Sequence, residues 1–231
     1  MSTSVDQDAI KSLFREKKEM FGLVYKFNLM PAKYIHRTWI DALISPLLFE
    51  KMTLSKRGTE KLSQWILTQY NLNQDYYYNF VDPLFRLALL PNEVIYKITF
   101  YCGVALNYKN ITAIIDKSKK EEIINEIGLE GYHFGVKKAP LLLGNRKILV
   151  KAWSVKDDVK SSIERDGVTY FLASFSQAPK TIFKRLLLKF PKEICKNQDS
   201  FYLGREESNH WLFLRRILKH AIEPKWHPLF S

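Results

Sequence analysis

Residues 167–191 read GVTYFLASFSQAPKTIFKRLLLKFP, an apolar run that one proline divides and a second proline ends. Proline suits the first turn of a helix and stops a helix after its end. Pro179 and Pro191 therefore predict the bounds of a second helix, which meets the first at a corner. Spacings of three and four residues place one apolar set on a single face of this second helix: Ile182, Phe183, Leu186, Leu187 and Phe190. We expect this face to be part of the core.

Basic side chains fill much of the remaining circumference of the second helix: Lys180, Lys184, Arg185 and Lys189. In one interpretation they form a solvated face behind a core helix, as in most amphipathic helices. In the other interpretation the basic face binds a partner. The spacing alone is compatible with both.

The composition favours a folded, helical protein with a strong positive charge. The chain has 231 residues, of which 46% are hydrophobic, so disorder over most of its length is excluded. Only 9 glycines and 9 prolines argue against a turn-rich β-sandwich. The formal net charge of +12 suits an acidic partner, which could be nucleic acid, anionic lipid or an acidic protein face.

Helical periodicity recurs along the chain and predicts a mainly α fold, a single-domain irregular helical bundle. We expect an amino-terminal helical extension over residues 1–25 and one helical domain over residues 26–231. Gly128 is expected to stop the helix over residues 119–127. Gly131 and Gly135 are expected to break the helical pattern, and residues 147–153 suit either a short strand or a helix. A minor β element around 131–153 is therefore an alternative.

The sequence shows no arrangement typical of catalysis or of cofactor binding. Neither common glycine-rich phosphate loop occurs, and the five histidines lack metal-ligand spacing. Cys102 and Cys195 both lie among apolar residues, which predicts buried, unreactive thiols and fits a reducing compartment. The polar amino terminus predicts no signal peptide, and no apolar run is long enough to span a membrane. We expect a cytoplasmic, non-enzymatic protein without a cofactor or a bound metal.

A basic nucleic-acid-binding protein is the alternative function, and it depends on charge alone. No zinc finger, readable recognition helix or RNP motif is present. The basic residues are scattered along the chain, and most aromatic residues fall on apolar helix faces.

Several short motifs follow one another in order along nearly the whole chain. The first is Phe27-x-x-x-Pro31-Ala-x-Tyr34-Ile35-His36. The opening stretch supplies two more, Gly167-x-x-Tyr-Phe-Leu-Ala173 and, after Pro179, Phe183-Lys-Arg-Leu-x-Leu-x-Phe190-Pro191. The last, Pro228-Leu229-Phe230, lies just before the final residue. Together these motifs resemble those of the SctK (YscK) family of type III secretion proteins, and the last is similar to the family's ending.

The resemblance implies a cytoplasmic adaptor of the injectisome sorting platform, with a helical fold and no catalytic residues. Such an adaptor links the SctQ-like pod protein to the cytoplasmic domain of the SctD-like inner-membrane ring protein, and reaches the SctL-like spoke protein only indirectly. It would lie at the cytoplasmic face of the inner membrane. We expect the partner contacts on two basic helices: Lys184, Arg185 and Lys189 on one, and Arg215, Arg216 and Lys219 on the last.

Overall fold

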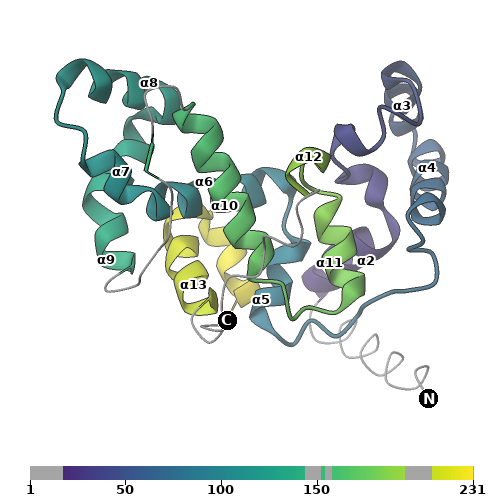
Figure 1. Ribbon diagram of the computed structural model, residues 1–231. Coiled ribbons are helices and arrows are strands. Elements are labelled where there is room, and N and C mark those ends of the chain that lie inside the picture. The colour runs from purple at the N-terminus through teal and green to yellow at the C-terminus, as the bar shows by residue number, and fades with distance from the viewer. Residues whose placement is uncertain (1–17, 144–151, 154–157, 196–209, 231) are drawn as a thin grey trace. The chain divides into compact units, whose positions relative to one another are not determined.

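The computed structural model describes residues 18–143, 152–153, 158–195 and 210–230, and across these residues the chain is helical with no β-strand (Figure 1). The prediction of a mainly α fold is confirmed. Packing groups the chain into two compact units, and each unit is assembled from segments that are distant in the sequence. The division into an extension over 1–25 and a domain over 26–231 stays a prediction.

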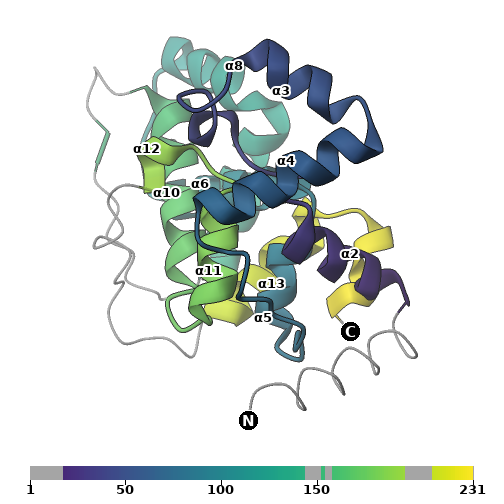
Figure 2. The ribbon, with the colours of Figure 1, turned by 90° about the vertical axis from the view of Figure 1, so that its right-hand side faces the viewer.

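The first unit contains residues 1–92, 177–197 and 225–231. Its described α-helices are α2 (Lys18–Leu29), α3 (Pro46–Thr53), α4 (Lys56–Gln69), α5 (Pro83–Arg86), α11 (Lys180–Leu187) and α12 (Lys192–Cys195). Its 3₁₀ turns are η1 (Pro31–Lys33), η2 (Arg37–Trp39), η3 (Leu87–Leu89) and most of η7 (Pro224–Phe230). Helices α3 and α4 are consecutive and pack against each other (Figure 2).

Aromatic rings and the apolar face of α11 fill the core of the first unit. Phe27 stacks on Tyr34 and meets Phe80 edge-on, with 6.0 Å between ring centroids in each pair. The apolar residues expected on the inner face of α11 are buried, apart from the half-buried Phe183. The prediction that this helix is a core element is confirmed.

The second unit contains residues 93–176 and 198–224. Its described helices are α6 (Asn92–Leu106), α7 (Tyr108–Thr112), α8 (Lys117–His133), the π-helix η4 (Phe134–Lys138), α9 (Ala139–Leu143), α10 (Val159–Ala173) and α13 (His210–Ala221). Helix α6 is buried around most of its circumference, which suits its nearly continuous apolar sequence.

Two glycines let α6 and α10 cross at backbone contact. A Cβ atom on Gly103 would lie 1.9 Å from the carbonyl oxygen of Ile163, and one on Gly167 would lie 1.9 Å from the carbonyl oxygen of Thr99. Any larger residue would force the two backbones apart. This crossing explains why a glycine opens the stretch at 167–191.

The expected helical break at Gly131–Gly135 is wrong. Residues 131–143 are helical, and they run from the end of α8 through η4 into α9. Both glycines make room for neighbouring side chains, because a Cβ atom on Gly135 would lie 2.9 Å from the Cδ1 atom of Ile111. The kink lies at Gly128, whose φ of 76° suits only glycine. The strand alternative therefore has no support at 131–143. It is untested at 144–151, which lie outside the described residues.

Candidate protein-docking surfaces

Arg185 points into the core of the first unit. It is fully buried, and its Nη2 atom donates to the carbonyl oxygen of Leu72 at 2.8 Å. Its Nη1 atom donates to the carbonyl oxygen of Thr181, one turn earlier in α11, at 3.3 Å. Burial lowers the pKa of the guanidinium below its ordinary value. This side chain joins α11 to the segment that follows α4.

Lys189 lies four residues after Arg185, and it is also buried. Its Nζ atom donates to the carbonyl oxygen of Leu90 at 2.6 Å and lies 5.1 Å from the centroid of the Tyr34 ring. The expected docking role of Arg185 and Lys189 is therefore corrected, since both heads bind carbonyl groups of the chain's own interior. Of the three cations expected to dock on this helix, Lys184 alone is exposed.

The two motifs at 27–36 and 179–191 lie together, which explains their joint presence in the sequence. The backbone N–H of His36 donates to the carbonyl oxygen of Leu188 at 2.7 Å. Just after the first motif, the indole Nε1 atom of Trp39 donates to the carbonyl oxygen of Phe190, also at 2.7 Å. These motif residues hold the first unit together, so docking surfaces have to be sought elsewhere.

Helix α3 carries an exposed apolar surface in the first unit. None of its eight residues is buried. Four leucines on the helix and beside it are exposed, and we call them the leucine surface: Leu43, Leu47, Leu48 and Leu54. Leu54 is 87% exposed and Leu47 61%. Several exposed leucines on and beside one short helix make it a candidate interaction site, because leaving them in water has a cost that contact with a partner removes.

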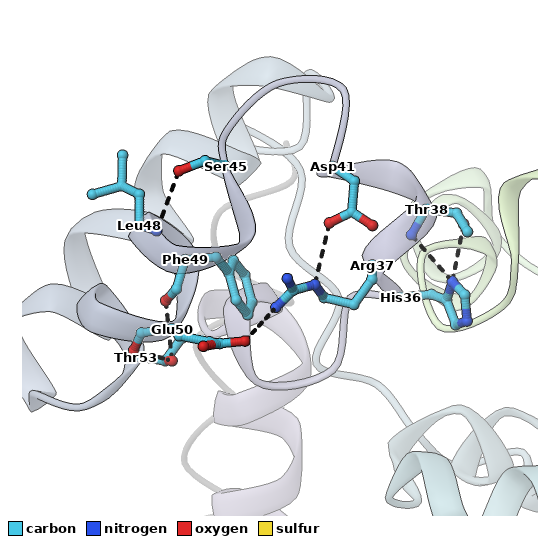
Figure 3. A network of polar contacts seen from close by, with 9 residues as sticks. All are labelled: His36, Arg37, Thr38, Asp41, Ser45, Leu48, Phe49, Glu50 and Thr53. Atoms are coloured by element: carbon cyan, nitrogen blue, oxygen red, sulfur yellow. Dashed lines mark hydrogen bonds and ion pairs between the residues drawn. The ribbon is translucent and has the colours of Figure 1, made fainter.

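Besides its packing against α4, helix α3 has polar contacts with the turn that precedes it (Figure 3). The Nε atom of Arg37 donates to Oδ1 of Asp41 at 3.2 Å, and its Nη1 atom lies 4.0 Å from Oε1 of Glu50. The same guanidinium lies 4.9 Å from the centroid of the Phe49 ring. Ser45 caps the helix by accepting from the N–H of Leu48 at 3.4 Å. Arg37 thus joins the preceding turn to the inner side of α3, while the leucines face outward.

The three cations expected on the last helix are exposed in the second unit. Arg215, Arg216 and Lys219 all lie on the outer side of α13, opposite the buried Phe213, Leu214, Ile217 and Leu218. The Nη1 atom of Arg216 also donates to the carbonyl oxygen of Leu142 at 2.9 Å, so this residue caps the end of α9. The structure thus places these cations on a surface, and their binding role stays a prediction.

A cavity of about 320 Å³ opens beside α13, and we call it the basic socket. Buried Tyr101 and Phe134 form its floor, with their ring centroids 4.7 Å apart. Its lining is completed by Glu130 and by four groups that can carry positive charge: His133, Lys137, Lys138 and His220. The cavity lies wholly within the second unit.

The electrostatics of the basic socket favour an anion. Its carboxylate, Glu130, accepts a hydrogen bond from the Tyr101 hydroxyl at 2.6 Å. The Nζ atom of Lys138 lies 3.5 Å from Nδ1 of His220. Burial, together with Lys138 and Lys219, lowers the pKa of His220 below its ordinary value. The site is therefore already crowded with positive charge.

Neither the leucine surface nor the basic socket was identified from the sequence. Leu47 and Leu54 are seven residues apart, which places them on one side of α3, but Phe49 and Met52 are apolar too, so the spacing does not show which side is exposed. The basic socket could not be found from any short stretch of sequence, because its residues come from α6, α8, η4 and α13.

Among the described residues, no group of three or more His, Cys, Asp or Glu side chains is arranged to hold a metal ion. No helix in the described ranges has the length and apolar character needed to cross a membrane.

Comparison with known proteins matches this chain to a protein family and to a solved structure. The profile of the family described as YOP proteins translocation protein K (YscK) matches residues 23–216. A solved structure, described as the cytoplasmic domain of the T3SS sorting platform protein PscK from P. aeruginosa, is similar with a TM-score of 0.62 and 20% sequence identity. The similarity covers 88% of this chain and 97% of that one. A comparison with curated protein sequences finds no match.

Proposed function

This chain belongs to the YscK family, as its motifs indicated, and we propose that it is a cytoplasmic adaptor of the type III secretion sorting platform. In this proposal it links an SctQ-like pod protein to the cytoplasmic domain of an SctD-like inner-membrane ring protein, and it has no catalytic role. It would work at the cytoplasmic face of the inner membrane, with any SctL-like spoke protein attached only through the pod protein. The observation that carries the proposal is the family match over residues 23–216.

The two exposed surfaces support a protein that binds two partners. The leucine surface belongs to the first unit, and the basic socket with the α13 cations belongs to the second. Their chemistry differs, because one is apolar and the other is basic. An adaptor needs two surfaces that different partners can occupy at the same time, and an apolar patch and a basic patch select different partners.

Pairwise co-purification of the full chain with each candidate partner tests the proposal. We expect the wild-type chain to retain the pod protein in one experiment and the ring protein's cytoplasmic domain in the other. The L47E/L54E variant should lose one partner and keep the other. A matched control, V81E/I115E, changes two apolar residues that are 73% and 87% exposed and lie outside the leucine surface. Failure of the wild-type chain to bind either partner would contradict the proposal.

The R215E/R216E/K219E variant tests the α13 cations. Its matched control, K117E/K119E/K120E, makes the same change in net charge on α8 of the same unit. We expect the α13 variant to weaken one partner about tenfold, since rim charges steer encounter and reject mismatched partners. Equal losses in the variant and in its control would show that net charge alone is responsible. Retardation of random DNA that falls steeply with salt would instead favour the nucleic-acid alternative.

A further inference from the structure

The rim of the basic socket carries positive charge that the described part of the chain does not neutralise. Within the described ranges, no carboxylate lies within ion-pair distance of Lys137 or Lys138, and the Glu130 carboxylate binds the Tyr101 hydroxyl. Both lysines are exposed, at the end of η4. π-Helices are rare and often mark functional sites, because one inserted residue redirects the side chains that follow. Here the π-helix presents two adjacent lysines at the mouth of a cavity.

The floor of the socket is aromatic. The rings of Tyr101 and Phe134 meet edge to face, and the His220 ring lies against Phe134 with 5.5 Å between centroids. A cavity of about 320 Å³ is larger than a single carboxylate or phosphate requires. Its shape and lining therefore suit an apolar side chain on the floor and an anionic group at the rim.

The anion that fits is a carboxylate on a protein chain. Phosphate sites in proteins commonly use backbone N–H groups at a helix N-terminus or in a glycine-rich loop. Here α8, η4 and α9 follow one another without a free N-terminus at the socket, so recognition falls to lysine and histidine side chains. Lysine is a flexible point charge without a fixed donor geometry, so two adjacent lysines can meet the carboxylates of an acidic segment in more than one arrangement.

We propose that the basic socket binds an acidic segment of a protein partner, in which an Asp or Glu lies within four residues of a large apolar side chain. The apolar side chain packs on Tyr101 and Phe134, and the carboxylate binds Lys137 and Lys138 at the rim. The proposal rests on the proposed function, since it specifies how a platform partner would bind. It adds the residues and the chemistry of that contact.

His220 gives the contact a pH dependence of definite sign. The charged and titratable groups around its ring are Lys138 from η4, Lys219 from α13, and the socket's His133, Lys137, Glu130 and Tyr101. A bound carboxylate would offset the lysines and raise the pKa of His220. Bound protein then takes up a proton that free protein lacks, so affinity rises as pH falls from 8 to 6.

The test compares K137E/K138E with K119E/K120E, a variant that reverses two adjacent lysines on α8 of the same unit. Affinities of the full-length variants for the pod protein and for the ring protein's cytoplasmic domain are measured by titration calorimetry at pH 6 and pH 8. We expect K137E/K138E to weaken one partner about tenfold or more and to flatten its pH dependence. The K119E/K120E control should match the wild-type chain. If the wild-type chain binds a partner and K137E/K138E binds both partners unchanged, the socket proposal is overturned and the proposed function stands.

A second measurement covers the case in which the wild-type chain binds neither partner and the proposed function fails. Benzoylphenylalanine replaces Lys137 in the full chain inside cells that assemble the secretion apparatus, and the crosslinked peptide is sequenced. We expect a peptide with Asp or Glu within four residues of a large apolar residue. A peptide without that feature, a nucleic-acid crosslink, or no crosslink would overturn the socket. Lys119 carries the same probe as the control position.

Discussion

Replacing Arg185 with glutamate should unfold the first unit, whereas the same change at its neighbour Lys184 should not. Arg185 is fully buried and donates to the carbonyl oxygen of Leu72, while Lys184 is exposed on the other side of α11. The R185E variant leaves that carbonyl without a donor, which costs about 1–3 kcal/mol. It also buries an unpaired carboxylate, which costs about 3–5 kcal/mol more. The sum of about 4–8 kcal/mol is comparable to the whole stability of many domains, about 5–15 kcal/mol.

Two further variants calibrate this prediction. K184E changes the same charge at an exposed position and should alter stability by about 0.5 kcal/mol or less. R185M retains much of the apolar bulk and removes the charge, so its cost should be about 1–3 kcal/mol, mainly from the unpaired carbonyl. Urea unfolding followed by circular dichroism measures all three. An R185E variant as stable as K184E would refute the buried placement of the guanidinium, and the solvated basic face would again be the better interpretation.

Three other predictions follow from the packing and the pKa shifts. Gly167→Ala brings a Cβ atom 1.9 Å from a carbonyl oxygen of α6, so it should lower the free energy of unfolding by about 1–3 kcal/mol and the melting temperature with it. A Cβ atom on Gly22 would have nothing within 4 Å, so Gly22→Ala should raise the free energy of unfolding by about 0.5–1 kcal/mol. Burial raises the pKa of the Cys102 thiol, and it raises the pKa of the Cys195 thiol to about 12. Neither thiol should therefore react with Ellman's reagent at pH 8 before the protein unfolds, and rapid labelling of the native protein would contradict this. Because the pKa of His220 is lowered in the folded chain, the unfolded chain binds a proton there more readily, and stability should fall as pH drops from 7.5 to 5.5. The fall should be smaller in His220→Gln. Identical plots of stability against pH for the two proteins would contradict the lowered pKa of His220.

The core residues of α11 could be predicted from the sequence, because apolar residues at helical spacing indicate the buried face. The spacing of Ile182, Leu186 and Leu187 can be recognised without knowing which segments pack against them, and these residues are buried as expected. The same periodicity could not assign Arg185 and Lys189, since a basic side chain on a helix is usually solvated. Their burial depends on carbonyl groups of Leu72 and Leu90, about a hundred residues away, which no local pattern reveals.

The role of each glycine was also ambiguous in the sequence, because it too depends on distant parts of the chain. Gly131 and Gly135 resemble helix breakers in a single sequence, yet they lie inside helix where a Cβ atom would crowd neighbouring side chains. Gly128, which was expected to stop the helix, does interrupt it, with a positive φ. A sequence shows that the residue has no side chain, but it does not show whether space or conformation is the reason.

The motifs that identify the family proved to be structural. Tyr34 donates to the carbonyl oxygen of Phe27 at 2.7 Å, and the terminal motif contributes the carbonyl oxygen of Leu229, which accepts from Arg86 at 2.9 Å. The candidate docking surfaces use other residues, on α3, η4 and α13. The motifs therefore indicated the family, whereas the α13 cations on a candidate surface came from the charge pattern of the last helix.

Simultaneous binding of two partners is the central claim, and one measurement tests it directly. The full chain is mixed with the SctQ-like pod protein and with the cytoplasmic domain of the SctD-like ring protein, and the mass of the product is measured by size-exclusion chromatography with light scattering. We expect a single complex that contains all three proteins, and an excess of either partner should not displace the other. Displacement of one partner by the other, or a failure of the chain to bring the two together, would contradict the adaptor function.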